Sequence, residues 1–274
     1  MPEPDGIDTA RFTFGVNWQR FLAVLDENRI DEAEKSLTSM LGVPSLRGKT
    51  FLDVGCGSGL FSLAAMRLGA NRVHSFDYDA ASVNCARELK ARYFPNDNRW
   101  SVERGDVLDQ GYLGRLGTWD VIYSWGVLHH TGDMWQALRN VADLAEPGSR
   151  AFISIYNDQG AKSRYWTRVK RLYNTGPAGR AVVLGAFVPM FAARRLVHDL
   201  VHLENPVASY RDYYKDRGMS RIHDWVDWLG GYPFEVARPE AIVSFYQEQQ
   251  FELERMKTCG DGLGCNEFVL RKRA

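Results

Sequence analysis

From residue 50 to residue 157 the chain alternates between two hydrophobic patterns. Short apolar and β-branched runs, typical of buried strands, are separated by longer stretches whose apolar positions recur at helical spacing. The predicted strands are 50–55, 72–79, 100–107, 119–128 and 149–157, with helices at 60–69, 81–93 and 134–145. This alternation predicts a parallel sheet with helices on both faces and right-handed crossovers.

The pattern resumes near the carboxyl terminus, with a helix at 239–250 and strands at 251–259 and 266–273. The turn between these two strands is too short for a crossover, so the strands are predicted to be antiparallel. The sequence therefore predicts an α/β fold with a seven-stranded sheet, mostly parallel and ending in an antiparallel hairpin.

Two further segments lie outside this alternation. Residues 1–48 contain a helical pattern that stops near Gly42 and predict an amino-terminal helical cap. Residues 158–237 form an insertion that is far longer than an ordinary connection. We therefore expect a core made of 49–157 and 238–274, with 158–237 as an inserted helical lid or substrate region.

The overall charge weakens the case for a nucleic-acid partner. The 274 residues include 34 Lys and Arg and 34 Asp and Glu, so no net charge draws the chain to a polyanion. The first residues lack the pattern of a secretory signal, and the longest apolar run, 181–193, is shorter than a membrane span. The four cysteines show no paired spacing, which predicts free thiols and a cytoplasmic protein.

The segment DVGCGSG, residues 53–59, follows a predicted strand and opens a predicted helix. Glycines allow a sharp turn and let the backbone approach a ligand closely. The spacing G-x-G-x-G differs from the dinucleotide motif, and no P-loop Lys-Ser/Thr follows, which argues against NAD and ATP. Asp53 would repel a pyrophosphate but suits an ammonium or sulfonium ion.

This loop resembles the D/E-x-G-x-G-x-G motif of class I S-adenosylmethionine-dependent methyltransferases, and the match extends over about 50–157 and 239–274. The resemblance implies a Rossmann-like fold, S-adenosyl-L-methionine as cofactor, S-adenosyl-L-homocysteine as product and no metal. It assigns the ribose hydroxyls to Asp77 and the adenine amino group to Asp106. Asp79 is the rival of Asp77, although it occupies a helix N-cap position.

Neighbouring positions complete the predicted cofactor site. An aromatic segment, 11–21, either packs in the core or folds over the cofactor. The predicted cofactor contacts are Asp53, Gly55, Cys56, Gly57, Asp77, Tyr78, Asp106, Val107, Ser124 and Trp125, with Asn17 and Trp18 from the aromatic segment.

Two adjacent histidines follow the fourth predicted strand, where a parallel sheet places its chemistry. No H-x-x-H or HExxH pattern is present, and neighbouring side chains in an extended backbone face opposite sides, so a metal site is not expected. His129 is either a base or acceptor contact, or a residue that hydrogen-bonds backbone, and it is the best candidate for the catalytic residue that activates the acceptor. For His130 the pattern favours a structural role before a helix capped near Asp133, with acceptor contact as the alternative.

Further acceptor contacts are predicted at Tyr156 and Asn157, which end the fifth strand. Trp225 and Trp228 either face the acceptor or pack inside the insertion. The mixture of basic and aromatic residues at 156–173 is compatible with a lid, a nucleic-acid surface or a membrane surface. The apolar stretch that follows is loosely similar to the insertion of ubiquinone-biosynthesis O-methyltransferases, which keeps peripheral membrane contact open.

The sequence thus predicts an enzyme that transfers a methyl group from S-adenosylmethionine to oxygen or nitrogen of a small-molecule acceptor. One alternative is an RNA methyltransferase acting on tRNA, which would need a local basic face. The other is a non-catalytic protein that only binds S-adenosylmethionine. The acceptor and the oligomeric state are left open.

Overall fold

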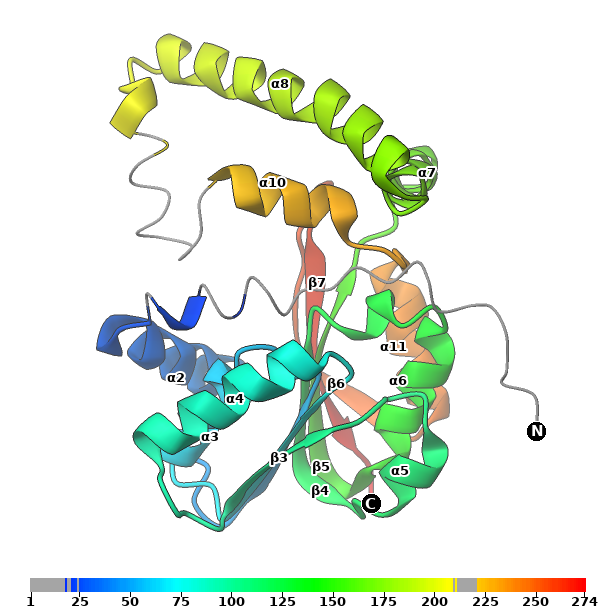
Figure 1. The fold of residues 1–274 in the computed structure, drawn as a ribbon. Coiled ribbons are helices and arrows are strands. Elements are labelled where there is room, and N and C mark those ends of the chain that lie inside the picture. The colour runs from blue at the N-terminus through cyan, green and yellow to red at the C-terminus, as the bar shows by residue number, and fades with distance from the viewer. Residues whose placement is uncertain (1–17, 19–20, 24, 209, 211–220) are drawn as a thin grey trace, which may run out of the picture. The chain divides into compact units, whose positions relative to one another are not determined.

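The computed structural model describes residues 18, 21–23, 25–208, 210 and 221–274 (Figure 1). The chain divides into two compact units. One contains, among the described residues, 18, 21–23, 25–160 and 235–274 and is called the core unit. The other contains, among the described residues, those between 161 and 234 and is called the insertion unit.

The core unit is built on a seven-stranded sheet with the strand order β3-β2-β1-β4-β5-β7-β6. Strands β1 to β5 pair in parallel, and β7 pairs antiparallel with both β5 and β6. The predicted fold class is therefore confirmed. The strands are β1 Thr50–Val54, β2 Arg72–Asp77, β3 Trp100–Arg104, β4 Trp119–Trp125, β5 Ala145–Tyr156, β6 Phe251–Lys257 and β7 Cys265–Lys272.

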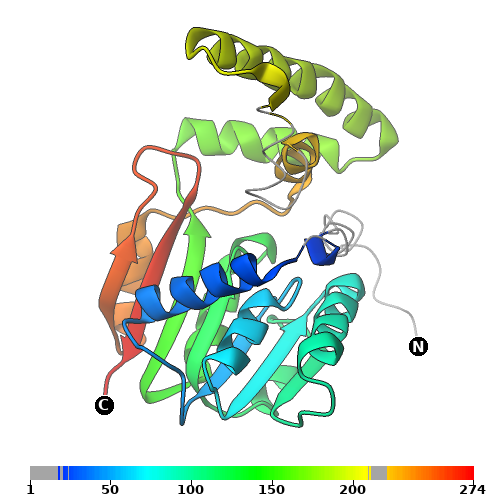
Figure 2. The same cartoon turned by 90° about the vertical axis from the view of Figure 1, so that its left-hand side faces the viewer.

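Helices cover both faces of this sheet (Figures 1 and 2). Phe51 of β1 packs with α2, α3 and α4, whereas its neighbour Leu52 packs with α5, α6 and α11 on the other face. Both side chains are fully buried, as expected for a central strand whose side chains alternate between two covered faces. The helices are α2 Glu27–Leu41, α3 Leu60–Arg67, α4 Ala80–Tyr93, α5 Gln110–Gly114, α6 Met134–Asp143 and α11 Pro239–Glu248.

Local capping explains where several helices begin and end. Asp79 precedes α4 and accepts a hydrogen bond from the Ala81 amide at 2.9 Å. Asp133 precedes α6 and accepts from the Gln136 amide at 3.2 Å. Gly42 ends α2 in the left-handed conformation, with φ of 64°. These caps satisfy helix-end groups that lack partners inside the helix, and they confirm the predicted boundaries.

The structure differs from the predicted pattern after the third and fourth strands. β4 ends at Trp125, three residues earlier than expected, because Gly126 adopts a φ of 76°. A short 3₁₀ turn, η2 Leu128–His130, follows. β3 ends at Arg104 instead of residue 107, and α5, which is too short to show a periodic pattern, lies before β4.

The longer helices in the described part of the insertion unit are α7 Ala161–Tyr173, α8 Pro177–Val201 and α10 Arg221–Gly230. A small hydrophobic core that includes Val169, Val183 and Leu229 joins them. The expectation that no segment reaches membrane-spanning length is wrong for α8, because the helix extends beyond the apolar run 181–193. By length and composition, α8 could cross a membrane.

The chain leaves the core unit and returns to it at adjacent points. The Ala237 amide donates to the carbonyl oxygen of Tyr156 at 3.0 Å, and the Asp158 amide donates to the carbonyl oxygen of Ala237 at 3.1 Å. These bonds form a short parallel bridge beyond the end of β5. The bridge brings residue 235 to the carboxyl end of the sheet.

Candidate cofactor and acceptor site

The loop after β1 is held against the end of β2 by its backbone. The amides of Gly55 and Cys56 both donate to the carbonyl oxygen of Phe76, at 2.9 and 3.0 Å. Gly55, Gly57 and Gly59 have φ angles of 75°, 51° and 81°, in the left-handed region that glycine enters without steric cost. The backbone therefore requires glycine at these three positions.

All three glycines also make room for other side chains of the core unit. A Cβ atom at Gly55 would lie 2.4 Å from Cγ1 of Val127, and one at Gly57 would lie 2.9 Å from Cε2 of Trp18. The glycine loop is thus in contact with the segment that follows β4. Trp18, a predicted cofactor contact, lies against the loop, whereas Asn17 lies outside the described residues.

Asp77 closes the glycine loop from the end of β2. Its Oδ2 accepts from the Gly57 amide at 2.9 Å, and its Oδ1 accepts from the Asp79 amide at 2.9 Å. Burial raises the pKa of Asp77 to about 6, against the opposing effect of these hydrogen bonds. The side chain of Asp79 instead caps α4, so of the two rivals Asp77 is the acid bound to the loop.

Asp53 lies beneath the loop in a buried hydroxyl network. Its Oδ2 accepts from the Ser62 hydroxyl at 2.5 Å, and Ser62 contacts the Ser75 hydroxyl at 2.6 Å. Burial raises the pKa of Asp53 to about 7, and the bond from Ser62 opposes this shift. Asp53 was expected beside a ligand cation, but it is only 2% exposed. Cys56 is a buried free thiol, and burial raises its pKa well above the ordinary value.

The residues predicted near the adenine follow β2 and β3. The Gly105 amide donates to the carbonyl oxygen of Asp77 at 3.1 Å, which holds the two strand ends together. Asp106 accepts from the amide two residues further on at 2.9 Å. Val107 is buried, and its carbonyl accepts from Nδ2 of Asn140 at 2.8 Å. Tyr78 leaves 37% of its surface exposed.

The last two residues of β4 differ in their surroundings. Ser124 is buried and donates to the carbonyl oxygen of Val54 at 3.0 Å, so it ties β4 to β1. Trp125 is 45% exposed, and its indole donates to Glu267 of β7 at 3.1 Å. Ser124 thus stabilises the pairing of β4 with β1 beneath the glycine loop. Trp125 lies at the exposed carboxyl end of β4.

The two histidines lie together in η2. Their ring centroids are 4.5 Å apart, and the Tyr156 ring centroid is 4.2 Å from that of His129 and 5.7 Å from that of His130. The expectation that their side chains face opposite sides is wrong, because Gly126 ends the extended strand before them. The ring of His129, the candidate base, is fully buried, whereas His130, for which a structural role was favoured, is partly exposed.

Glu235 holds this histidine segment in place and was not predicted. Its carboxylate accepts from the amides of Gly132 at 3.0 Å and Met134 at 3.1 Å, and its own amide donates to the His129 carbonyl at 3.0 Å. The free amides at the start of a helix attract a carboxylate. Burial raises the pKa of Glu235, and the hydrogen bonds from these amides oppose that shift. No local pattern could reveal this contact, because it joins residues about a hundred positions apart.

Asn157 serves the carboxyl-terminal hairpin. Its Nδ2 donates to the carbonyl oxygen of Gly260 at 3.0 Å, and its Oδ1 accepts from Asn266 at 3.1 Å. The side chain of Asn157, a predicted substrate contact, therefore binds the turn between β6 and β7 in this structure. Its neighbour Tyr156 is the one that contacts the histidines.

Trp225 and Trp228 lie in the insertion unit and pack within it. The Trp228 ring centroid is 4.3 Å from that of Trp166, and the Trp225 ring centroid is 5.6 Å from that of Phe191. The ammonium of Lys170 lies 4.5 Å from the Trp228 ring centroid and donates to the Trp228 carbonyl. Burial lowers the pKa of Lys170 to about 7. These contacts match the packed-core alternative considered for the tryptophans.

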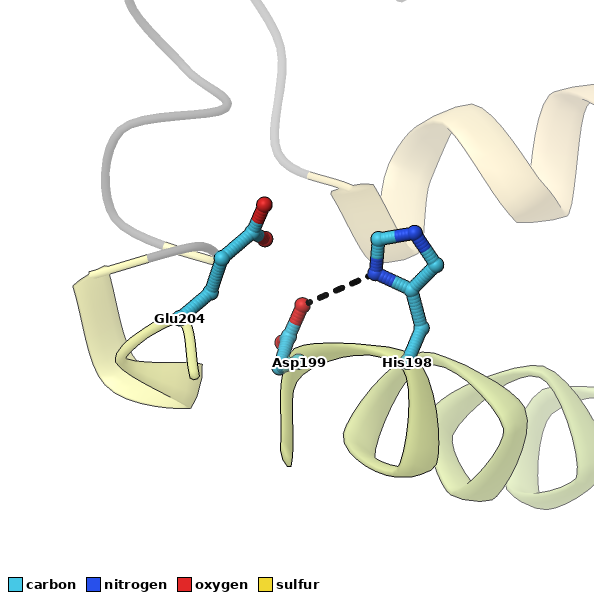
Figure 3. Close-up of side chains that lie close together, drawn as sticks. All are labelled: His198, Asp199 and Glu204. Atoms are coloured by element: carbon cyan, nitrogen blue, oxygen red, sulfur yellow. Dashed lines mark ion pairs between the residues drawn. The ribbon is translucent and has the colours of Figure 1, made fainter. Parts of the chain in front are cut away.

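One group of metal-ligand side chains gathers in the described part of the insertion unit. His198, Asp199 and Glu204 bring potential ligand atoms within 4.8 Å of one another near the end of α8 (Figure 3). The guanidinium of Arg195 already pairs with Asp199 at 2.6 Å and with Glu204 at 2.7 Å. An arginine thus supplies the positive charge that a metal would bring, and we assign no metal to this cluster.

The core unit fits the cofactor that the sequence motif implies. The order of the sheet reverses between β1 and β4, and ligands of α/β sheets bind at such switch points. The glycine loop extends from β1 at this point, and the carboxylate of Asp77 accepts a hydrogen bond from its Gly57 amide. Fold and site together define the class I S-adenosylmethionine-dependent methyltransferases.

The family follows from comparison with known sequences. A family model described as "Methyltransferase domain" matches residues 25–252, and the chain belongs to this family. The ribosomal protein L11 methyltransferase of Klebsiella pneumoniae (strain 342) is 28% identical over 134 residues, which is 45% of each chain. That of Tolumonas auensis is 46% identical over 80 residues, 26% of this chain and 27% of the relative. The chain thus spans less than half the length of these curated relatives.

Solved structures share the fold over nearly the whole chain. Magnesium protoporphyrin IX methyltransferase from Synechocystis PCC 6803, solved with bound SAH, has a TM-score of 0.55 and 13% identity. The alignment covers 94% of this chain and 96% of that one. The N-methyltransferase NodS from Bradyrhizobium japonicum WM9 has a TM-score of 0.51 and 15% identity over 91% and 100% of the two chains. At these identities the likeness establishes the fold.

Proposed function

We propose that this protein transfers a methyl group from S-adenosylmethionine to an oxygen or nitrogen atom of a small-molecule acceptor. The observation that carries the proposal is the contact between the glycine loop and the segment after β4. Gly55 accommodates Val127, two residues before His129, at the switch point of the sheet. Predicted cofactor and acceptor residues therefore share one end of two adjacent strands.

The cofactor side would be formed by backbone and carboxylates. Gly55 and Gly57 let the loop approach the cofactor, Asp77 accepts from the ribose hydroxyls, and Asp106 accepts from the adenine amino group. Trp18 lies on the loop and excludes water from it. When bound, S-adenosylmethionine supplies an electrophilic methyl group on its sulfonium sulfur.

The acceptor side would be formed by His130 and Tyr156, which are both partly exposed. The buried ring of His129 supports Tyr156, and Glu235 fixes the backbone of η2. For a hydroxyl acceptor, His130 takes the proton, because a neutral hydroxyl is a weak nucleophile. For an amine acceptor, the same residues contribute orientation alone.

Two comparisons bear on the size of the acceptor. The structure of magnesium protoporphyrin IX methyltransferase, whose name gives a small-molecule substrate, aligns over 94% of the chain. The ribosomal protein L11 methyltransferases align over 45% of it or less. The similarity that extends over more of the chain is thus the one to a methyltransferase named for a small molecule, and it supports a small-molecule acceptor.

The test is turnover with a panel of small hydroxyl, carboxyl and amine acceptors, with S-adenosylhomocysteine and methylated product detected by mass spectrometry. His130→Ala should lower kcat with a hydroxyl acceptor by about ten- to a hundredfold and flatten the rate profile over about pH 6 to 9. Its affinity for S-adenosylhomocysteine should stay unchanged. His202→Ala, at an exposed position of the insertion unit, is the control.

Other outcomes would contradict the proposal. Methylation of RNA alone, with affinity that falls steeply with salt, would identify the RNA methyltransferase alternative. Cofactor binding without product from any acceptor would identify a non-catalytic protein. If His129→Ala lowered kcat more than His130→Ala and flattened the pH profile, His129 would be the base.

A further inference from the structure

Helix α8 carries an apolar surface that the proposed activity does not use. Its large exposed side chains leave between 46% and 72% of their surface uncovered. Only 6% of its most apolar 18-residue window is buried. We call this surface the α8 face, formed by Val182, Met190, Leu196, Val197, Leu200 and Val201.

The internal packing of the insertion unit does not account for the α8 face. The opposite side of α8 makes the contacts within the unit, where Val183 is buried and Phe187 lies 5.2 Å from Trp166 of α7 between ring centroids. A helix that packs on one side normally presents polar residues on the other. A contiguous apolar surface of this kind marks an interaction site or a membrane contact.

The charges around the α8 face point to an anionic partner. Residues 161–201 contain eight Lys or Arg, of which Lys170 is buried, and a single acid, Asp199, although the whole chain is balanced at 34 and 34. Asp199 is buried and paired with Arg195 at 2.6 Å, so it does not offset the exposed charges. Arg194 of α8 is exposed, whereas the guanidinium of Arg180 lies over the Tyr173 ring of α7, 5.5 Å from its centroid. An exposed arginine thus lies on the helix that carries the apolar surface.

We propose that the α8 face docks on the surface of an anionic lipid bilayer. Its aliphatic side chains enter the boundary between headgroups and acyl chains, and Arg194 binds a lipid phosphate. The helix lies along the surface and does not span the bilayer, because its other side packs on α7 and α10 and carries the Arg195–Asp199 pair. The inference does not depend on the proposed methyl transfer.

The test is flotation of the full chain with vesicles of phosphatidylcholine alone or with roughly 30% phosphatidylglycerol. Binding to the anionic vesicles should exceed binding to the neutral ones and should weaken with salt. The double variant Val182→Glu/Val197→Glu should weaken binding by at least about tenfold, because both side chains would bring charge into the apolar layer. Arg194→Glu should reduce only the preference for anionic lipid.

Met256→Glu is the matched control, since Met256 is 43% exposed on β6 of the core unit. It should bind vesicles as the unaltered protein does. Circular dichroism verifies folding, and Met190→Glu replaces the double variant if that variant does not fold.

Three outcomes would overturn the proposal. The first is absence of vesicle binding, or binding that the charged variants leave unchanged. The second is a dimer in light scattering that the double variant dissociates, which would place a second copy on the α8 face. The third is tight binding of RNA that depends on Arg194 but not on Val182.

Discussion

Asp53 and Asp77 of the core unit and Lys170 of the insertion unit are ionisable groups of opposite charge that lie in different surroundings. In the core unit, Asp53 and Asp77 accept hydrogen bonds from a hydroxyl and from amides of the glycine loop and its flank. In the insertion unit, Lys170 lies against aromatic rings and donates to one carbonyl at the end of α10. The buried acids thus shape a loop that can receive a ligand, whereas the buried lysine joins two helices.

The same comparison gives the two units opposite pH dependences. Asp53 has a pKa of about 7 in the folded protein and about 4 when unfolded, so the folded state binds the extra proton between these values. Its contribution to stability therefore falls as pH rises from about 4 to 7. Lys170 has a pKa of about 7 folded and about 10.5 unfolded, so its contribution rises with pH between those values.

The largest expected effect concerns the loop that distinguishes the core unit. Gly55→Ala should lower the free energy of unfolding by about 3 kcal/mol or more and abolish binding of S-adenosylhomocysteine, because the new Cβ would collide with Val127. Gly126→Ala is the control, since its φ of 76° matches the 75° of Gly55 and nothing lies within 4 Å. It should cost about 1 kcal/mol. Chemical denaturation and calorimetry measure the two quantities.

If Gly55→Ala and Gly126→Ala lowered the free energy of unfolding equally, backbone conformation, and not contact with Val127, would make glycine necessary at position 55. The functional argument would then lose its main support, because the loop and the segment after β4 would not depend on each other.

The next effect tests the buried charge of the insertion unit. The free energy of unfolding should rise by about 2–3 kcal/mol between pH 7 and pH 10 through Lys170, and Lys170→Met should remove that rise. Urea unfolding followed by tryptophan fluorescence reports it, since Trp166 and Trp228 lie in the same cluster. Lys162→Met, at an exposed position of α7, should keep the rise. If the free energy of unfolding rose equally with pH in Lys170→Met and Lys162→Met, Lys170 would be charged in the folded protein.

The core unit was largely predictable, because its elements repeat simple periods and its loop needs glycine at fixed positions. Apolar runs located all seven strands, and Asp53 to Gly59 located the glycine loop after β1. The ends of strands were less predictable, since Gly126 stops β4 by its own conformation within an apolar run.

Contacts between distant residues could not be predicted in the same way. Glu235 reaches the start of α6 from the far end of the insertion, and no local pattern carries that information. The exposure of His129 and His130 depends on the 3₁₀ turn and on Tyr156, so the sequence located the pair but not the role of each residue. In α8, the apolar pattern is the same for a buried helix and an exposed one.

The smallest expected effect separates the two acids that compete for the ribose. Asp77→Asn should weaken binding of S-adenosylhomocysteine by about thirtyfold, or about 2 kcal/mol, in titration calorimetry at pH 7.5. An asparagine has one acceptor oxygen for the two amides that Asp77 now binds, so its NH₂ group would face an N–H donor. Asp79→Asn should change affinity by less than about threefold, because asparagine caps a helix as well as aspartate does.

The pKa of Asp77 adds a second signature to this pair. Because burial raises it to about 6, the unaltered protein and Asp79→Asn should bind more weakly as pH falls from 7 to 5, when Asp77 takes up a proton. Asp77→Asn should lack this dependence. If instead Asp79→Asn caused the larger loss and removed the pH dependence, the ribose would belong to Asp79. The hydrogen bond between Asp77 and Gly57 would then serve only to hold the empty loop in shape.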